Sequence, residues 1–551
     1  MAVVLGLNAV FHDPAAALVI DGITVAAAEE ERFSRRKHGK TPVPFSTWEL
    51  PEQAIRFCLE TAGVGAEDLD AIGYSYDPSL ATVPSAHLQD EAWEGMRTLY
   101  AERAPRFLRT VLPGVDEGRF RHVPHHVAHA ASAWGHAPFD TCAVMVLDGR
   151  GERGSYLAGV VRGARLEVLA RQDLPHSLGL RYEELTAHLG YRRSSDEYKV
   201  MAMASYGQPV HLDAFRRLVR TTGDGGFVTE PVDWSAFAPP GRGDGAIDEE
   251  HVDLASTVQT RLEEVLLELA GWLHDRTGER CLALAGGVAL NCVANSRIHA
   301  EGPFEDVWVQ PAAGDAGTAV GAALQLAAEL GDTPVPPPTP ALGPEWSDDE
   351  VESILRAAAA PFERPADIAD AAAEVLAADG IVAWFQGRSE FGPRALGHRS
   401  LLAHPGYERN LERLNDVKGR EQFRPVAPMV QLEAAKDAFE GGPIPSPNML
   451  FTHRVRNGWA ERIPAVVHVD GTARVQTVDR ATEPLVHRML DGFRARTGLP
   501  VVVNTSLNTA GRPMVDHPRD ALECFGSAPI DALAIGPFLV RRGAMFAGAG
   551  R

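Results

Sequence analysis

Two histidines lie four residues apart in the segment RHVPHHVAHAASAW, where they could bind one metal ion together. Pro124 is tolerated at the first turn of a helix, so we expect a helix there that places His125 and His129 on one face. His126 lies about 100° around the same helix and is not expected to be a further ligand. Histidines with this spacing are also found as purely structural residues, so the pair alone does not establish a metal site.

Two aspartates strengthen the metal interpretation. Asp148 ends the apolar segment TCAVMVLD, and Asp315 lies in AAGDAGTAVGAA, a glycine-flanked segment that opens a predicted helix. Acidic residues at strand ends beside glycines commonly face a ligand, although each alone could be only a cap or turn residue. With His125 and His129 they form a set that would accept Fe(II), Mn(II) or Zn(II), and ligand type does not choose among these metals.

Two glycine-rich turns and one further histidine lie in the same part of the chain. The turns DGRGERG (148–154) and AGGVALN (285–291) each follow an apolar segment. Glycine backbone lets N–H groups approach a phosphate or nucleoside closely, so the pair of turns favours nucleotide binding over two ordinary tight turns. His12, beside Asp13, could be a general base, because its unperturbed pKa of about 6.5 suits proton transfer at neutral pH. It could also be only an exposed turn residue.

The C-terminal part of the chain is rich in cations. The segment GRSEFGPRALGHRS (387–400) places arginines and a histidine among glycines directly after an apolar strand. Guanidinium groups and flexible backbone donors together favour an anion-binding site over a solvated basic face. Lys418, Arg420 and Arg424 follow in VKGREQFRPVAPM, and Arg474 follows a turn in DGTARVQT.

Polar residues alternate in the segment VVVNTSLNTAGRP. At a strand end, Asn504, Ser506 and Asn508 would therefore point to one side. Together with the cations they predict a triphosphate or acyl phosphate ligand.

These residues must be positioned by an α/β fold. Residues 3–7 and the segment AAALVIDG form one predicted hairpin, and TCAVMVLD with SYLAGVVRG forms a second, which indicates an internal repeat. The segment LALAGGVALN predicts a strand, a glycine turn and a helix. A long core helix is predicted from apolar residues at helical spacing: Leu254, Val258, Leu262, Val265, Leu266, Leu269 and Leu273. GIVAWFQ and PVVVN are predicted as buried strands of the C-terminal part.

Bulk properties limit the domain organisation and the function. A chain of 551 residues can bury more than one core, and the proline-rich segment 333–346 predicts a stiff linker between domains at 1–332 and 347–551. The formal charge of −21 disfavours nucleic-acid partners. Five scattered cysteines indicate reduced thiols, and no leader or membrane span is evident, so we expect a cytoplasmic protein.

The chain resembles the O-carbamoyltransferases that tailor antibiotics and nodulation factors. The resemblance spans nearly the whole chain and is carried by these segments: FHDPAAALVIDG, AEEERFSRRKHG, HHVAHAASA, LDGRGE, AGGVALN, GRSEFGPRALGHRSLL, FRPVAPM and VVVNTSLNTAGRPMV. It implies a duplicated actin/sugar-kinase-like ATPase domain, similar to the tRNA threonylcarbamoyl-transfer protein, followed by a smaller α/β domain similar to threonylcarbamoyl-adenylate synthase. It also implies formation of carbamoyl adenylate from carbamoyl phosphate and ATP, then carbamoyl transfer to an alcohol.

The resemblance assigns roles to individual residues. The metal, typically iron, would be held by His125, His129, Asp148 and Asp315, and His12 would lie near the transfer site. The nucleotide in the first domain would be lined by Gly149, Gly151, Gly286, Gly287 and Asn291. ATP, with Mg(II), and carbamoyl phosphate would be bound in the second domain by Arg394, Lys418, Arg424, Arg474, Asn504 and Ser506, of which Lys418 and Arg424 are expected to be catalytic.

Two rival functions are considered beside this one. A tRNA threonylcarbamoyl-type enzyme would share both domain types but would need a basic face, which the charge of −21 disfavours. A non-catalytic actin-like nucleotide switch would leave the C-terminal cations unexplained. We therefore expect a small-molecule hydroxyl acceptor, no nucleic acid or membrane partner, and a homodimer by resemblance.

Overall fold

The computed structural model describes residues 2–39, 50–81 and 91–543. The chain divides into two compact units, Met1–Pro337 and Pro338–Arg551. The division falls inside the segment 333–346. Each end of this segment is bound to its own unit: the Val335 amide donates to Gly22 O at 3.0 Å, and the Phe391 amide donates to Pro340 O at 2.8 Å.

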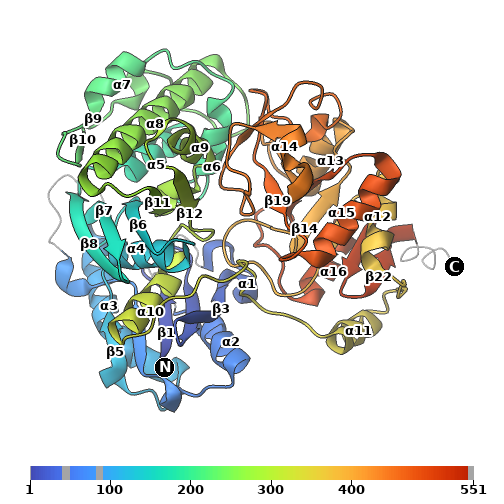
Figure 1. The fold of residues 1–551 in the computed structure, drawn as a ribbon, viewed down its shortest axis with the longest axis horizontal. Helices are drawn as coiled ribbons and strands as arrows, with labels where there is room; N and C mark the ends of the chain where they lie inside the picture. The colour runs from blue at the N-terminus through green and yellow to red at the C-terminus, as the bar shows by residue number, and fades with distance from the viewer. Residues whose placement is uncertain (1, 40–49, 82–90, 544–551) are drawn as a thin grey trace. The chain divides into compact units, whose positions relative to one another are not determined.

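The N-terminal unit contains two five-stranded sheets of the same topology (Figure 1), in the orders β3-β2-β1-β4-β5 and β8-β7-β6-β11-β12. In each sheet, three antiparallel strands continue into two parallel ones. The strands are β1 (Val3–Asn8), β2 (Ala15–Ile20), β3 (Ile23–Glu29), β4 (Ala71–Tyr74), β5 (Phe120–His122), β6 (Thr141–Leu147), β7 (Gly154–Arg162), β8 (Arg165–Asp173), β11 (Cys281–Ala285) and β12 (Asp306–Val309). The predicted duplicated α/β fold is confirmed.

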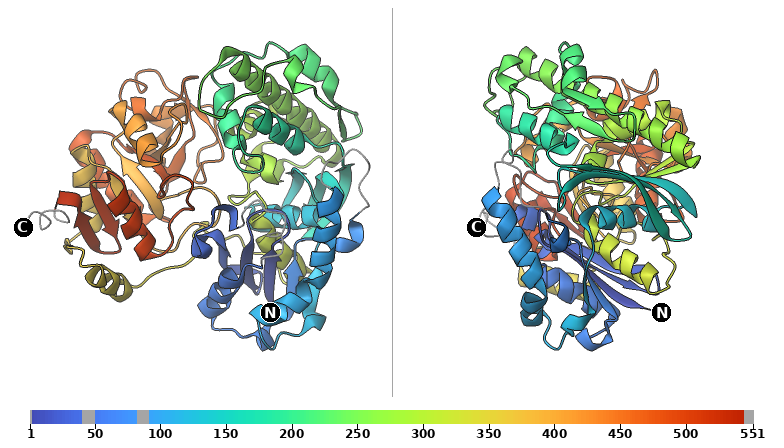
Figure 2. Two further views of the ribbon diagram at one scale, coloured as in Figure 1. Left: turned by 180° about the vertical axis from the view of Figure 1, so that it is seen from behind. Right: turned by 90° about the vertical axis from the view of Figure 1, so that its left-hand side faces the viewer.

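Two helices join the sheets to each other. Helix α10 (Gly317–Glu329) packs on β1 and β2, helix α4 (His125–His136) packs on β6 and β11, and the two helices pack together (Figure 2). Their backbones approach closely because Gly321 has no side chain: a Cβ atom there would overlap the carbonyl oxygen of Ala128. Both helices are rich in alanine at this contact, so they lie close together and the contact is buried.

Further helices complete the N-terminal unit. Helix α8 (Glu249–Thr277) is the predicted core helix, and its seven predicted apolar residues are all buried. The others are α1 (Glu31–Ser34), α2 (Glu52–Ala62), α3 (Glu91–Val111), α5 (Leu178–His188), α6 (Glu197–Ala204), α7 (Leu212–Leu218) and α9 (Cys292–Glu301), with a small sheet of β9 (Val219–Thr221) and β10 (Phe227–Thr229).

The C-terminal unit is built on a mixed seven-stranded sheet of order β19-β15-β20-β14-β13-β21-β22. Its strands are β13 (Val382–Phe385), β14 (Arg399–Ala403), β15 (Ala427–Gln431), β19 (Gln476–Val478), β20 (Val501–Ser506), β21 (Ala532–Ile535) and β22 (Phe538–Arg541). The main helices are α11 (Asp348–Ala357), α12 (Ile368–Ala377), α13 (Arg409–Val417), α15 (Pro484–Thr497) and α16 (Pro518–Ser527). The short elements are α14 (Ala435–Ala438), β16 (Phe439–Glu440), β17 (His453–Val455) and β18 (Thr472–Ala473). Both strands predicted here, GIVAWFQ and PVVVN, are present.

Among the described residues, every helix is too short or too polar to serve as a bilayer-crossing segment. All five cysteines are free thiols.

A glycine of the second turn tests this architecture. Gly286 has φ 91° and ψ 158°, and a Cβ atom there would overlap Leu147 O, so Gly286→Ala should destabilise the protein by about 2 kcal/mol or more. Gly271, inside α8, has open space around it. Gly271→Ala should therefore stabilise the protein, by up to about 1 kcal/mol. Thermal unfolding of both variants checks the contrast, and equal midpoints would contradict the turn conformation.

Candidate functional site

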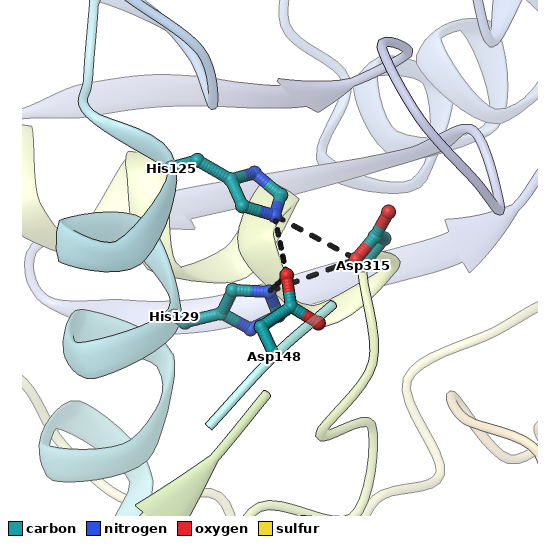
Figure 3. A group of neighbouring side chains, drawn as sticks. All are labelled: His125, His129, Asp148 and Asp315. Carbon is teal, nitrogen blue, oxygen red and sulfur yellow. Dashed lines mark ion pairs between the residues drawn. The ribbon is translucent and has the colours of Figure 1, made fainter. Parts of the chain in front are cut away.

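The four predicted metal ligands converge at the contact between α4 and α10 (Figure 3). His125 and His129 lie one turn apart on α4, Asp148 directly follows β6, and Asp315 lies just before α10. All four side chains are buried or nearly so, with exposed fractions between 0% and 11%. His126 is not a member of this group, as expected.

The distances within the group suit a shared metal ion. His125 Nε2 lies 3.3 Å from Asp148 Oδ2 and 3.6 Å from Asp315 Oδ1. His129 Nε2 lies 3.8 and 3.7 Å from the same two atoms. Hydrogen bonds of this type are usually shorter, at about 2.7–3.2 Å. Ligands about 2.1 Å from a tetrahedral metal ion are separated from one another by about 3.4 Å, so the observed separations fit such a centre.

The hydrogen bonds around His125 leave one ring nitrogen available to a metal. His125 Nδ1 lies 3.0 Å from the carbonyl oxygen of Ser75, to which it can only donate. Nε2 faces the two aspartates, and it is buried without a hydrogen-bond partner among the described residues. This is the arrangement by which proteins orient metal-binding histidines. Burial alone would lower the pKa of His125, but the Asp148 and Asp315 carboxylates raise it well above its ordinary value, so a metal ion would bind here by displacing the Nε2 proton. The ring nitrogens of His129 are likewise buried without such a partner in the described part of the chain.

The carboxylates are held ionised and oriented. Burial alone would raise the pKa of Asp148, but the facing His125 and His129 imidazoles hold it well below its usual range. Asp315 also has a lowered pKa, because the same facing histidines outweigh the effect of its burial. The Gly287 amide donates to Asp148 Oδ1 at 3.1 Å, which leaves Oδ2 toward the histidines. Two buried carboxylates and two imidazoles in this arrangement can hold a divalent cation.

The predicted nucleotide-binding residues divide into two groups. Gly149, Gly286 and Gly287 surround the metal-type centre: a Cβ at Gly287 would contact Asp148, and the Gly286 amide donates to Ala313 O near Asp315. Gly151 packs against His126. Asn291 caps α9, its Oδ1 accepting from the Ala294 amide at 3.1 Å while its Nδ2 donates to Gln259. Within this structure Asn291 therefore has a structural role.

His12 lies in the β1–β2 turn and forms an ion pair with its neighbour. His12 Nδ1 is 2.9 Å from Asp13 Oδ2. Burial alone would lower the pKa of His12, but the Asp13 carboxylate raises it to about 9. The side chain is thus protonated at neutral pH and is not set up to accept a proton. Its expected role as a base stays a prediction.

In the C-terminal unit, Lys418 and Ser506 are brought together. Lys418 is 6% exposed, and its Nζ donates to Ser506 O at 2.6 Å, to Ser506 Oγ at 2.9 Å and to Asn508 Oδ1. Neutral oxygens therefore fix the position of this ammonium group without neutralising its charge themselves.

Asn504 links the remaining predicted residues of this unit. Its Nδ2 donates to Ala395 O at 3.0 Å and to Gln476 Oε1 at 2.7 Å, so Arg394 and Arg474 lie one and two residues from its partners. Asn504 also pairs with Ala427 of β15, three residues after Arg424. Arg394, Arg424 and Arg474 are close in sequence to the partners of Asn504, so the backbone places them near the end of one strand.

Two arginines of the 387–400 segment bind the chain itself. Arg399 is fully buried and donates to Gln386 O at 2.9 Å and to Pro344 O at 3.1 Å, and Arg388 donates to Gly343 O at 3.0 Å. They hold residues 342–344 in place. Arg388 and Arg399 are therefore engaged by backbone carbonyls, and the predicted anion-binding site is limited to the other residues of this segment.

Several residues of the site were not singled out from the sequence. Glu152 accepts from the His125 amide at 2.7 Å and so fixes the start of α4. Ser75 orients His125, and Gln476 orients Asn504. Only Glu152 carried a sequence signal, as a charged residue in the glycine-rich turn after Asp148.

Comparisons with known proteins cover both units. The family model for the carbamoyltransferase N-terminus matches residues 3–324, and that for the carbamoyltransferase C-terminus matches residues 373–542. An uncharacterized protein of Synechocystis sp. is 35% identical, with 98% of this chain and 96% of that protein covered. Nodulation protein NolNO of Sinorhizobium fredii is 37% identical, with 97% of this chain and 80% of that protein covered.

One solved structure, component A of the (R)-2-hydroxyglutaryl-CoA dehydratase of Acidaminococcus fermentans, aligns with a TM-score of 0.32 and 15% identity. The alignment covers 60% of this chain and 100% of the chain in that structure.

The metal-type centre predicts a specific loss of metal on substitution. His129→Ala removes one of four ligands, so the metal content of the purified protein should fall at least about tenfold from near one equivalent. His126→Gln, one residue after His125 on the same helix, should keep the metal because His126 lies outside the group. Elemental analysis by mass spectrometry measures both. Full metal content in His129→Ala would contradict the assignment.

The His12–Asp13 pair predicts a pH dependence of stability. Because the pKa of His12 is raised from 6.5 to about 9, the pair stabilises the fold fully below pH 6.5 and loses this contribution as pH rises through 9. In chelator-treated protein, the free energy of unfolding should therefore fall from pH 6.5 to 9 more steeply for wild type than for His12→Gln. Urea unfolding at several pH values measures this. Parallel pH profiles would disprove it.

Proposed function

The chain belongs to the carbamoyltransferase family, and on this premise we propose that it makes carbamoyl adenylate from ATP and carbamoyl phosphate in its C-terminal unit. The N-terminal unit would pass the carbamoyl group to a hydroxyl of a small molecule. The observation that supports this division is that each unit contains its own buried polar centre, a metal-type His/Asp group in one and a fixed ammonium group in the other.

The activation step explains the cations of the C-terminal unit. The carbonyl of a carbamoyl group is a poor electrophile, because nitrogen and oxygen lone pairs donate into it, so it needs a good leaving group, and adenylation provides AMP. Lys418, held by Ser506 and Asn508, would stabilise negative charge on the reacting phosphorus. Arg394, Arg424 and Arg474, with Mg(II), would bind the triphosphate and carbamoyl phosphate.

The transfer step is proposed at the His/Asp group. A divalent cation held by His125, His129, Asp148 and Asp315, with iron preferred over manganese or zinc by resemblance, would polarise the adenylate phosphate as a leaving group. The glycine turns at 149 and 286–287 would place backbone N–H groups near that phosphate. A free carbamoyl adenylate would hydrolyse, so these residues must also keep water away.

The acceptor is proposed to be a hydroxyl of a secondary metabolite, such as a sugar or a macrolide. The net charge of −21 disfavours binding of a polyanion such as RNA. A tRNA-modifying enzyme is therefore less favoured. A nucleotide switch is less favoured because it would leave the buried ammonium group of Lys418 without a function.

Product analysis with ATP and carbamoyl phosphate tests the function. Wild type should release AMP and pyrophosphate, and a mixture of polyols, amino sugars and macrolides should gain a carbamoyl mass in one component. Lys418→Ala should lower AMP formation at least about 100-fold, whereas the exposed Lys436→Ala should not. His129→Ala should keep AMP formation and lose transfer.

Other products would overturn the proposal. Release of ADP and phosphate would indicate a switch or kinase instead. Loss of AMP formation in His129→Ala would overturn the division of labour between the two units.

A further inference from the structure

A second cluster of histidine and acidic side chains lies in the N-terminal unit, formed by His12, Asp13 and His38. Its spacing differs from that of the metal-type centre. His12 Nδ1 lies 2.9 Å from Asp13 Oδ2, and His38 Nδ1 lies 3.0 Å from Asp13 Oδ1. These are hydrogen-bond distances, shorter than the 3.3–3.8 Å between the members of the metal-type group. The second cluster is therefore held together by hydrogen bonds.

The second nitrogen of His38 faces a hydroxyl group. His38 Nε2 lies 2.8 Å from Ser195 Oγ. The pKa of Asp13 is lowered well below its usual range, because the two histidines outweigh the effect of its burial, so its carboxylate only accepts hydrogen bonds. His38 Nδ1 must donate to Asp13, and a neutral His38 then presents a lone pair on Nε2 to the Ser195 hydroxyl. Ser195, His38 and Asp13 form a hydroxyl–imidazole–carboxylate series of the kind that activates hydroxyl groups.

Both ends of the series are fixed by the backbone. Asp13 has φ 45° and Ser194, beside Ser195, has φ 54°, conformations that non-glycine residues adopt rarely and that cluster at functional sites. Asn8 Nδ2 donates to the carbonyl oxygens of His12 and Asp13 at 2.7 and 3.0 Å. The Ser194 amide donates to Glu197 Oε1 at 2.7 Å.

The same scaffold reaches the metal-type centre. Asn8 Oδ1 accepts from Ser75 Oγ at 3.2 Å, and the Ser75 carbonyl accepts from His125 Nδ1. One set of hydrogen bonds thus positions both the turn that contains Asp13 and the imidazole ring of His125. The charge of Asp315 also contributes to the raised pKa of His12, so the two clusters lie within electrostatic reach of each other.

The two histidines on Asp13 have different capacities. His12 is already protonated at neutral pH, since Asp13 raises its pKa to about 9 against the effect of burial. It can donate a proton or contribute charge, and it keeps Asp13 ionised. His38 offers the only lone pair of the series that is aimed at a hydroxyl in the described structure.

We propose that His38, rather than His12, is the base of the transfer step and that Ser195 relays the proton to it. This rests on the proposed function. The acceptor O–H bond breaks as its oxygen bonds to the carbamoyl carbon, and the proton passes to Ser195 Oγ while the Ser195 proton passes to His38 Nε2. The bond from the carbamoyl carbon to the adenylate oxygen breaks, and AMP leaves with the electron pair. Ser195 is regenerated in the same step.

Chemical rescue in the full-length protein tests the proposal. With ATP, carbamoyl phosphate and a probe mixture of glycerol, glucosamine and a macrolide glycoside, His38→Ala and His38→Gln should lower carbamoylated product at least about 100-fold. AMP formation should stay within about twofold of wild type in the same samples. Added imidazole should restore product to His38→Ala, because the side chain it replaces is 19% exposed, and a merely structural role would not give such rescue.

Matched variants separate the possible outcomes. Ser195→Ala should lower transfer at least about tenfold, and Ser205→Ala, at the other end of α6, should not change it. Normal transfer in His38→Gln, or imidazole rescue of His12→Ala but not of His38→Ala, would overturn the proposal alone. AMP formation by wild type without any carbamoylated probe would overturn the proposed transfer and this inference together.

Discussion

Two imidazoles lie buried at the contact of α4 and α10, each with its Nε2 atom 3.3–3.8 Å from the carboxylate oxygens of two buried aspartates, and the N-terminal unit is organised around this group. Buried carboxylates so close together are unfavourable unless positive charge faces them. The close approach of α4 and α10, which Gly321 permits, brings the histidines of α4 beside Asp315. A larger residue there would separate the histidines of one helix from the aspartate before the other.

The duplication explains how these residues meet. Each half supplies a sheet, and the helix that packs on one sheet packs against the helix of the other. His125 and Asp315 are 190 residues apart in sequence, yet the layer between the sheets makes them neighbours. Asn8 and Ser75 extend this layer to the β1–β2 turn. The protonation chemistry proposed for His38 is therefore tied to the metal-type centre by structure as well as by mechanism.

The C-terminal unit contains a buried positive charge in place of the buried carboxylates of the N-terminal unit. Lys418 is buried, and the oxygens of Ser506 and Asn508 satisfy its donors without cancelling its charge. A fixed cation of this kind suits a phosphate whose charge changes during reaction. The neighbouring arginines do not all serve that purpose, because Arg388 and Arg399 bind backbone carbonyls near the unit boundary.

The sequence by itself determined the repeated hairpins, the long helix α8, the buried strands and the four residues of the metal-type group. Each of these depends on local patterns: periodic burial, strand-end aspartates, or histidines one helix turn apart. Only the tertiary structure decided that Asn291 caps a helix, that Arg399 is tied to the backbone, and that His38 and Ser195 meet across 157 residues. It also decided the protonation of His12, since a pKa depends on burial and on the charges nearby, and the chain sets these only when distant segments pack together.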